Sequence, residues 1–476
     1  MASIAKGKAR EGSEEATMRQ MEELNRRLLD EFKAEDATAQ SRGYTVTSTI
    51  DLRTMPVDAA PPAARVANIF TTQPQDGALT ENVECILHSA AAKQELIEYP
   101  NFPRPTPRSH TNPVIPVLLA SLSDDDDGDG EGEGQGQGQG AEVKAPYRIA
   151  EVPSKGLGML ATRAIPQGAF ITAERPLLLG PQAQHLDGHN MQFSATATAR
   201  QRQRAAFTEA EKNLRIAFAR MAPANQTAYT ALHNAHQSDG SGPITGVMRT
   251  NAYEVCRLEG RTYAGVFKDL SRVNHSCSPN TTSYFDRASL SMLLFAVRDI
   301  PPGAEITSTY CGLLQPRAAR ARALKPYGIR CACAACTDPD PAASDANRLR
   351  ISRVADAVPA IVRWAGSPAL PDGLLLRPAL ALLQVIEAEG LEGSLAYVRV
   401  LYHVVLILQV LAVRGVRGAD TDGLLVYAAK WATLRGCRGE GERVGEAQFR
   451  EERERVMAAA LARSRLAPEG GQRAVE

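Results

Sequence analysis

The chain has 476 residues, of which 44% are hydrophobic and only 5% aromatic, a balance that favours a helix-rich, alanine-rich protein over an all-β one. Lysine plus arginine and aspartate plus glutamate each total 54, so the formal net charge is zero. Whole-chain electrostatics therefore give no case for binding nucleic acid directly. The length allows roughly two to four domains, each with a substantial core.

The ends and apolar runs of the chain indicate no secretion and no membrane span. Residues 1–10 are charged and lack an apolar stretch, so no secretory signal is expected. The longest apolar run, residues 400–413, contains His403 and Gln409 and is too short to span a bilayer, which predicts a buried helix. We therefore expect a nuclear or cytoplasmic protein, or one found in both places. In that reducing setting the eight cysteines are not expected to form a disulfide framework, and those clustered at short spacing are expected to bind metal.

Residues 1–123 are predicted to form an N-terminal region that is largely loop or disorder and contains one amphipathic helix. In this helix Met21, Leu24, Leu28 and Phe32 recur at spacings of three and four. A solvated helix is the simpler interpretation, and a helix that binds a protein partner is the alternative.

A linker is predicted at residues 124–142, where four aspartates precede glycines that alternate with Asp, Glu and Gln. Such a segment buries almost no apolar area and repels itself in its acidic half. Short antiparallel strands separated by glycine and proline turns are expected at 147–180. A helical insert follows at about 181–243, with an all-α, alanine-rich pattern from about 208 to 237, and strand character returns at 244–256 and 262–267.

Residues 341–476 are predicted to form an all-helical C-terminal domain. The expected helices cover 344–364, 377–389, 394–414, 424–435 and 446–465. Their apolar residues recur on one face, which indicates burial. A short solenoid of helix pairs, able to bind protein partners, and an ordinary helical cap on the preceding domain both agree with this pattern.

The first candidate for ligand binding is the turn Lys155-Gly156-Leu157-Gly158. Glycines without a Cβ let the backbone approach a ligand closely, although for this motif taken alone an ordinary β-turn is the better explanation. The turn is not a dinucleotide-binding fingerprint, because no third glycine and no helix follow it.

The run Asn274-His275-Ser276-Cys277 is more specific. An asparagine side chain offers both donors and an acceptor, which recognition of an adenine edge or of an amino-acid head group requires. His275 by itself could equally be a hydrogen-bonded core residue. A hairpin is expected just after this run, from strands at 281–285 and 290–297.

Three cysteines, Cys331, Cys333 and Cys336, are spaced too closely to be unrelated. Three thiolates leave a tetrahedral zinc ion one ligand short. The candidates for the fourth ligand are Cys256, Cys277 and Cys311. Cys277 would tie the metal to the Asn-His turn, whereas the alternative is three reduced thiols without a metal.

Two tyrosines flank this segment. Tyr310 ends a strand at 305–310, and Tyr327 lies just before the cysteines. Together they could direct two phenol oxygens into a narrow channel, while core tyrosines with satisfied hydroxyls are the alternative.

Taken in order, these motifs resemble the SET-domain family of protein lysine methyltransferases. The matching segments are 155–158 with the family's first Gly-x-Gly, 272–280 with Arg-x-Asn-His-Ser-Cys-x-Pro-Asn, 303–310 with the Gly-Glu-Glu-Leu-Thr-x-x-Tyr strand, and 331–336 with Cys-x-Cys-x-x-Cys. The last pattern is similar to the SET-and-MYND subgroup. Ala304 replaces the first glutamate of the strand motif, and residues 180–245 contain no cysteine, so the chain resembles the fungal-type proteins that lack the MYND finger.

The resemblance implies an α+β fold. It consists of a SET-domain β-fold of short antiparallel strands with the helical insert at 143–312, a post-SET zinc clip at 313–340 and the helical C-terminal region. It implies S-adenosylmethionine as the cofactor. The residues implied to bind it are Lys155, Gly156, Leu157, Gly158, Asn251, Asn274 and His275. The residues implied to bind zinc are Cys277, Cys331, Cys333 and Cys336. Tyr310 is implied as the catalytic tyrosine, and Tyr327 lines the lysine channel beside it.

The expected function is transfer of a methyl group from S-adenosylmethionine to a lysine amine of a protein substrate, histone or not. The alternative is a catalytically silent SET scaffold that binds protein partners. A zinc-dependent nucleic-acid binder is a third interpretation, and the neutral charge and the absence of a basic, aromatic-rich cluster near the cysteines argue against it.

Overall fold

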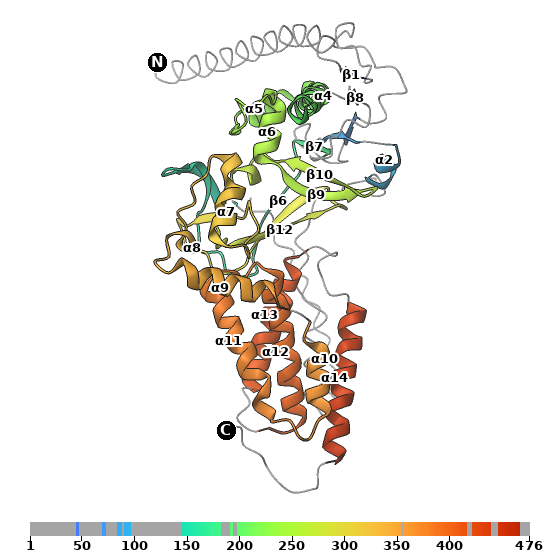
Figure 1. Cartoon of the computed structure of the whole chain (residues 1–476), viewed down its shortest axis with the longest axis vertical. Coiled ribbons are helices and arrows are strands. Elements are labelled where there is room, and N and C mark those ends of the chain that lie inside the picture. Colours follow the sequence, from blue (N-terminus) through green and yellow to red (C-terminus); the bar gives the residue numbers. More distant parts are fainter. Residues whose placement is uncertain are drawn as a thin grey trace, which may run out of the picture.

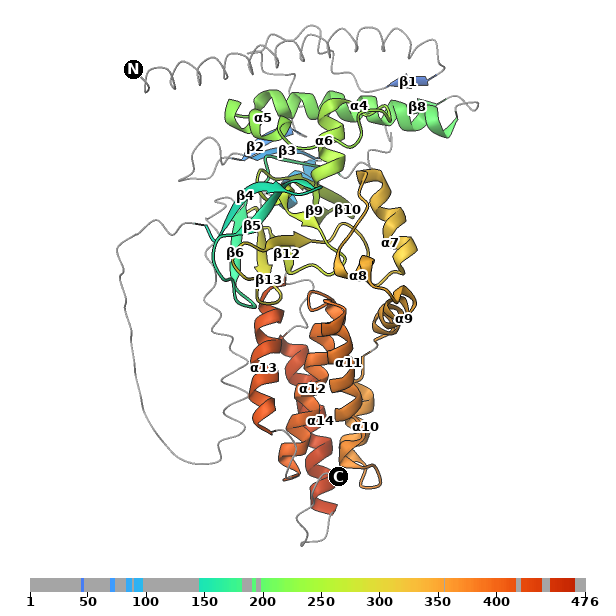
Figure 2. The same cartoon turned by 90° about the vertical axis from the view of Figure 1, so that its left-hand side faces the viewer.

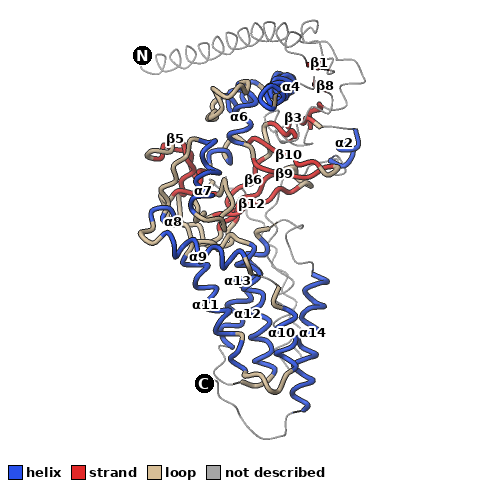
Figure 3. Tube along the Cα trace, in the orientation of Figure 1, coloured by secondary structure: helices blue, strands red, loops and turns tan. Residues whose placement is uncertain are grey.

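The computed structural model of the chain describes residues 44–46, 69–72, 83–87, 90–96, 145–181, 191–193, 198–354, 356–416, 421–438 and 446–466. The amphipathic helix expected at 21–32 and the linker expected at 124–142 lie outside these residues. A strand-rich part carries the insert helices on one side and is followed by a bundle of long helices (Figure 1). The same division is visible when helices and strands are coloured separately (Figure 3).

Within the described residues, the strands form three small sheets and one two-stranded pair. The five-stranded sheet contains, in order, β2 (Ile69–Thr72), β3 (Val83–Ile86), β7 (Leu178–Pro181), β10 (Arg261–Val266) and β9 (Tyr253–Leu258). The four-stranded sheet contains β11 (Asn274–His275), β14 (Glu305–Ser308), β5 (Gly156–Ala161) and β4 (Tyr147–Val152). The three-stranded sheet contains β12 (Thr281–Asp286), β13 (Ser291–Ala296) and β6 (Phe170–Glu174). Most neighbouring strands are antiparallel, but β11 pairs with β14 and β3 with β7 in parallel.

The hairpin predicted after the Asn-His turn is present as β12 and β13. These strands pair antiparallel from Thr281 opposite Ala296 to Asp286 opposite Ser291. All six residues of β13 are buried, because this strand lies between β12 and β6 and both of its faces are covered. This burial explains the continuous apolar run of the strand.

Part of the N-terminal region completes the strand-rich core. Residues 69–72, 83–86 and 90–96 fall in a stretch expected to be loop or disorder, and the structure corrects this expectation with strands β2 and β3 and helix α2 (Ala90–Leu96). Val83 and Cys85 belong to the same buried cluster as the residues of β5 and β13. The paired strands and this shared cluster anchor the segment to the sheet.

The insert contains three helices that cover one face of the five-stranded sheet: α4 (Ala199–Arg220), α5 (Pro223–Thr230) and α6 (Pro243–Asn251). It also contains a short strand, β8 (Met191–Phe193), paired with β1 (Tyr44–Val46), which lies before the stretch expected to be all-α at about 208–237. Strand was expected from residue 244, but Ile244 to Asn251 are helical. Pro243 starts α6, and the buried Glu211 carboxylate accepts the backbone N–H groups of Ile244 and Thr245, which satisfies the first turn.

The C-terminal region is a helical bundle. Its helices are α9 (Pro341–Ser352), α10 (Val358–Gly366), α11 (Leu376–Ala388), α12 (Leu395–Val413), α13 (Thr421–Gly436) and α14 (Glu446–Leu466). One helix was expected at 344–364, but it divides into α9 and α10, because Pro359 cannot continue a helix and instead occupies the first turn of α10. Among the described helices, α12 alone has the length and hydropathy of a membrane span, yet it lies at the centre of the bundle with 78% of its apolar window buried. The expected buried helix is therefore present, with the other helices of the bundle around it (Figure 2).

Candidate active site and cysteine cluster

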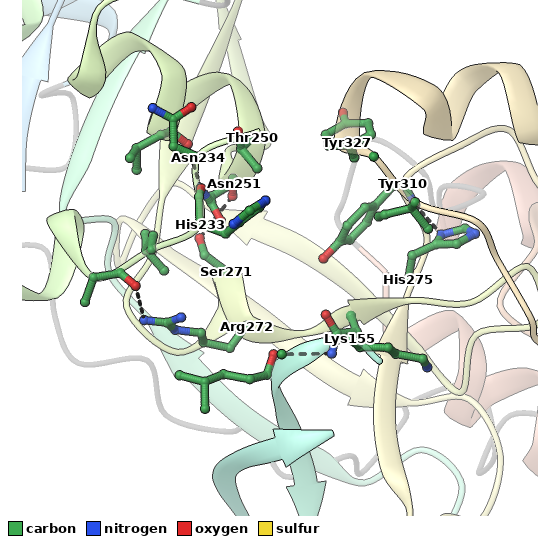
Figure 4. Close-up of a pocket in the computed structure, with 18 of the residues that line it drawn as sticks. Lys155, His233, Asn234, Thr250, Asn251, Ser271, Arg272, His275, Tyr310 and Tyr327 are labelled. Carbon is green, nitrogen blue, oxygen red and sulfur yellow. Dashed lines mark hydrogen bonds between the residues drawn. The ribbon is translucent and has the colours of Figure 1, made fainter. Parts of the chain in front are cut away.

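A cavity of about 950 Å³ lies between the insert helices and the loops that carry the sequence motifs (Figure 4). Most of the residues predicted for the site line this cavity. They are Lys155, Gly156, Leu157, Asn251, Asn274, His275, Tyr310, Tyr327, Cys331 and Cys333. Gly158, Cys277 and Cys336 do not line it. The structure thus brings together motifs that lie up to 178 residues apart in the chain (155 to 333).

The two glycines of the first motif have different roles. Gly156 has φ +73° and no atom within 4 Å of a built Cβ, so it supplies the left-handed backbone of the turn at the cavity wall. At Gly158 a Cβ would lie 2.6 Å from Cγ2 of Val152 and 2.8 Å from Nδ2 of Asn274. Gly158 therefore leaves room for the asparagine of the second motif rather than for a ligand.

Asn274 is held from both sides by the protein. Its Nδ2 donates to Oε1 of Glu305 (2.9 Å) and to the carbonyl oxygen of Leu157 (3.3 Å). The other oxygen of Glu305 lies 2.6 Å from Nζ of Lys155. Glu305, which sequence reasoning did not select, therefore links the first and second motifs. Both donors of the asparagine amide are used inside the protein, so its carbonyl oxygen and its backbone face any ligand.

His275 connects the cavity to the cysteines. Its Nδ1 accepts the backbone N–H of Tyr310 (3.0 Å), and its Nε2 lies 3.3 Å from Sγ of Cys277. Because Nδ1 is an acceptor, the neutral ring carries its proton on Nε2 and donates it to the sulfur. The buried ring thus fixes the position of Tyr310 on one side and a predicted metal ligand on the other.

Tyr310 has its hydroxyl in a defined direction. The hydroxyl donates to the carbonyl oxygen of Val273 (2.7 Å), and the ring lies 5.5 Å from the rings of both His275 and Tyr327. Burial raises the pKa of Tyr310 above its ordinary value, and the neighbouring Tyr327 and Glu305 raise it further. The phenol therefore stays protonated at physiological pH, and its oxygen keeps a lone pair for a ligand.

The insert supplies the opposite wall of the cavity. Nδ2 of Asn251 donates to the carbonyl oxygens of His233 and Val247, both at 2.7 Å. Nη2 of Arg272 donates to the carbonyl oxygen of Ala231 (2.9 Å) and ties the insert to the motif segment. Other lining residues, which sequence reasoning did not select for the site, include His233, Asn234, Thr250, Ser271 and Arg272. Ser271 and Arg272 lie three and two residues before Asn274, and Thr250 directly precedes Asn251, so their places beside predicted residues could have identified them. His233 and Asn234 belong to no motif.

The four predicted zinc ligands form one cluster. The sulfurs of Cys277, Cys331, Cys333 and Cys336 all lie within 4.8 Å of one another, with 3.9 Å from Cys277 to Cys331 and 3.5 Å from Cys277 to Cys336. A tetrahedral zinc ion with Zn–S bonds of about 2.3 Å separates its sulfurs by roughly 3.8 Å, so the donor set and its spacing fit zinc.

Two other cysteines had been considered for the fourth position. Cys311 groups with His275 and Cys277 within 4.8 Å, whereas Cys256 belongs to neither group of potential ligands. Of the three candidates, Cys277 is the one that completes a four-sulfur group.

Two buried arginines stand beside the cysteine cluster. The side chains of Arg320 and Arg348 are 0% exposed. Nη1 of Arg348 donates to the carbonyl oxygen of Cys277 (3.1 Å), and Nη2 of Arg320 to that of Ala335 (3.5 Å). A buried cation needs nearby negative charge, and a metal bound by four thiolates carries it. The two arginines therefore suit a cluster whose sulfurs are ionised.

Comparison with known proteins identifies the part of the chain that carries these motifs. Residues 156–311 match the family model described as the SET domain. The chain contains a SET domain. The SET-domain fold expected from the sequence, with its helical C-terminal region, is therefore confirmed.

Two curated relatives carry related names. The chain is 30% identical over 192 residues to histone-lysine N-methyltransferase set5 of Schizosaccharomyces pombe, a match that covers 40% of this chain and 50% of that protein. It is 35% identical over 92 residues to human histone-lysine N-methyltransferase SMYD3, which covers 19% of this chain and 21% of that protein. The chain thus spans half or less of the length of these relatives.

Among solved structures, the Neurospora SET domain protein DIM-5, a histone lysine methyltransferase, matches 36% of this chain and 53% of its own. The sequence identity is 19% and the TM-score is 0.18, an overlap too small to add to the argument.

Proposed function

We propose that this protein is a protein-lysine N-methyltransferase that uses S-adenosylmethionine. The observation that carries the proposal is the Tyr310 hydroxyl. It is half-buried and protonated, and it lies on the wall of the cavity that also holds the Gly156 turn, the Asn274-His275 segment and Tyr327. The names of the curated relatives support the same activity.

The cavity fits a cofactor of this kind in size and in its polar groups. A volume of about 950 Å³ accommodates a ligand the size of a nucleoside with an amino-acid arm. We assign the cofactor to the backbone of Lys155 to Leu157 and to Asn251, Asn274 and His275. The ring of His275 is engaged by Tyr310 and Cys277, so its backbone makes the contact. When bound, S-adenosylmethionine supplies a methyl group on a positively charged sulfur.

The substrate lysine must reach this cavity without its proton. Its reference pKa is near 10.4, and desolvation between the rings of Tyr310 and Tyr327 lowers it. The Tyr310 hydroxyl donates to Val273, so its oxygen accepts an N–H of the amine and orients the nitrogen lone pair. The rate enhancement comes from holding the amine in line with the methyl group, with no covalent enzyme intermediate.

Zinc has a structural role in this proposal. Cys277, Cys331, Cys333 and Cys336 would hold it in a closed four-sulfur site, which leaves no position for substrate. Its contribution is to join the Asn-His turn to the segment that carries Tyr327.

The proposed domains follow the sequence boundaries with one addition. The SET domain is assigned to 143–312, the post-SET segment to 313–340 and the helical domain to 341–476. Residues 83–87 and 90–96 are added to the SET core through β3 and α2. The substrate is a protein of the nucleus or the cytoplasm, and the helical domain is available for protein partners.

The test is transfer of labelled methyl from S-adenosylmethionine into core histones and into fractionated cell extract. Hydrolysis of the labelled protein then identifies the modified amino acid. Tyr310→Phe is compared with Tyr147→Phe, a matched control whose hydroxyl bonds to Asp269 away from the cavity. We expect methyl-lysine with the native chain and the control, and at least about a hundredfold less with Tyr310→Phe. Cofactor binding without transfer to any fraction would instead favour the silent scaffold, and label on another amino acid would contradict the proposal.

A further inference from the structure

The segment that joins Tyr310 to the end of the cysteine cluster is strongly basic. Residues 306–337 contain five arginines and lysines and no aspartate or glutamate, in a chain whose total formal charge is zero. In the structure this segment forms α7 (Arg317–Leu324), the short helix η5 (Lys325–Tyr327) and the loop into the cysteines. Helix α7 lies on the outside of the strand-rich part (Figure 2).

Four of these residues line a second cavity, of about 650 Å³, which we call the basic groove: Arg317, Arg322, Lys325 and Arg330. All four are exposed. Among the residues that the structure describes, none of them has a carboxylate oxygen within 4.0 Å of its charged nitrogen. The nearby Asp345 carboxylate is engaged elsewhere, since it accepts the backbone N–H of Arg317 (2.7 Å) and lies 3.7 Å from Nη1 of Arg320. The groove therefore carries positive charge that the surrounding protein does not compensate.

The basic groove adjoins the candidate active site. Gly328, Ile329, Arg330 and Cys331 line both cavities, so a single stretch of backbone separates them. An extended peptide advances about 3.3 Å per residue, so the residues next to a lysine bound beside Tyr310 and Tyr327 reach the groove within a few positions. Like charges in those positions would be repelled, and opposite charges would be attracted and oriented.

We propose that the basic groove binds an acidic segment of the substrate protein, a few residues from the lysine that is methylated. This rests on the proposed function and narrows its substrate class to lysines with aspartate or glutamate nearby. A single-stranded nucleic acid fits less well, because the groove is lined by no aromatic side chain on which a base could stack.

Binding to the full-length chain tests the proposal without methyl transfer. The probes are three fluorescein-labelled peptides with one central lysine flanked by glutamate, glutamine or arginine, and a short oligothymidylate, each measured by fluorescence anisotropy at low and moderate salt. The variant is Arg322→Glu with Lys325→Glu. The control is Arg353→Glu with Arg363→Glu, which makes the same charge change at two exposed positions of the helical domain.

We expect the glutamate peptide to bind at least about tenfold more tightly than the glutamine peptide, with the difference reduced by salt. The groove variant should lose this difference and the control should keep it. Equal affinities for the three peptides, or the same loss in both variants, would overturn the proposal. Oligothymidylate that binds as tightly and competes with the glutamate peptide would assign the groove to nucleic acid instead.

Kinetics separate this proposal from the proposed function. With methyl transfer measured on the same peptides, the groove should act on KM and leave kcat within about twofold, because it does not touch the reacting atoms. Methyl transfer with identical KM for the glutamate and glutamine peptides would contradict the role of the basic groove and would leave the proposed methyltransferase activity intact. Selective binding of the glutamate peptide with no methyl transfer to any protein would support the role of the basic groove and contradict the proposed methyltransferase activity.

Discussion

The helical bundle and the cysteine segment are stabilised in opposite ways. The bundle buries a large apolar cluster that includes Trp364, Trp431 and most of α12, and burial of such surface is the main force that stabilises it. The cluster around the cysteines contains Ala335 as its only apolar residue other than the cysteines themselves. Beside it lie Arg320 and Arg348, two cations removed from water. One region is held by apolar contact, and under the proposed zinc site the other depends on a charged centre at the four sulfurs.

This contrast also explains how the two regions meet. Arg348 comes from α9 of the helical region, but its Nη1 donates to the carbonyl oxygens of Cys277 (3.1 Å) and Leu313 (2.7 Å). Ser278, next to Cys277, donates to the carbonyl oxygen of Glu389 at the end of α11 (2.8 Å). The turn that holds the cofactor segment and a metal ligand is therefore the same turn on which the helical region docks.

Removal of the metal should have the largest effect, because it should unfold the cysteine segment and leave the helical bundle folded. A chelator that extracts zinc leaves four thiols that regain protons. The two buried arginines then lose the negative charge of the sulfurs and keep their carboxylate neighbours, Asp345 and Glu389. We expect residues 313–340 to become accessible to protease and the cysteines to react with thiol reagents, while the helical circular dichroism of the bundle persists. Unchanged protease resistance after complete chelation would show that the segment folds without metal.

Replacing one buried arginine should separate the two regions. Arg348→Met removes a cation that contacts the cysteine turn and leaves Glu389 unpaired, at a cost of about 3–5 kcal/mol in unfolding free energy. We also expect faster release of zinc to a chromogenic chelator. The matched control is Arg414→Met, which breaks a buried pair with Asp372 inside the bundle. It should lose similar stability, and zinc release that accelerates equally in both variants would contradict the special role of Arg348.

A smaller effect is expected at the glycine beneath Asn274. In Gly158→Ala the new Cβ displaces Val152 and the Asn274 amide, which should cost about 1–3 kcal/mol and weaken cofactor binding. Gly373→Ala is the control, because its Cβ meets no atom within 4 Å. Calorimetric titration with S-adenosylmethionine measures both, and an unchanged affinity in Gly158→Ala would mean that Asn274 does not position the cofactor.

The mildest change is in the pH dependence of turnover. Burial raises the pKa of Tyr310, so the phenol stays neutral and keeps its bond to Val273 throughout pH 7–10. The substrate amine gains reactivity as it loses its proton, so the rate should rise with pH by up to about tenfold per unit below the amine's pKa. A falling limb below pH 10 that disappears in Tyr310→Phe would show that the tyrosine ionises in that range.

Local motifs made much of the site predictable. Gly156, Asn274, His275, Tyr310 and the four cysteines were chosen from short runs whose chemistry is local, and the structure brings them together. The insert wall at His233 was missed, because its position depends on how helices α5 and α6 pack on the sheet. Arg348 was missed for a similar reason, since only the docking of α9 places it at Cys277.

The fold also divides into segments that local patterns predict and segments whose structure depends on distant partners. The hairpin of β12 and β13 and the buried helix α12 follow from apolar patterns within one segment. The strands at 69–72 and 83–86 do not, because the second of them pairs with β7, almost a hundred residues later in the chain, and the first pairs only with the second.

The most direct test of the proposed activity is to measure cofactor affinity and turnover on the same preparations of the native chain and Tyr310→Phe. If the phenol orients the substrate amine, the Kd for S-adenosylmethionine should stay within about twofold and the rate of lysine methylation should fall at least about a hundredfold. Equal turnover in the two proteins, at equal affinity, would contradict the role of Tyr310 and with it the proposed chemistry of the site.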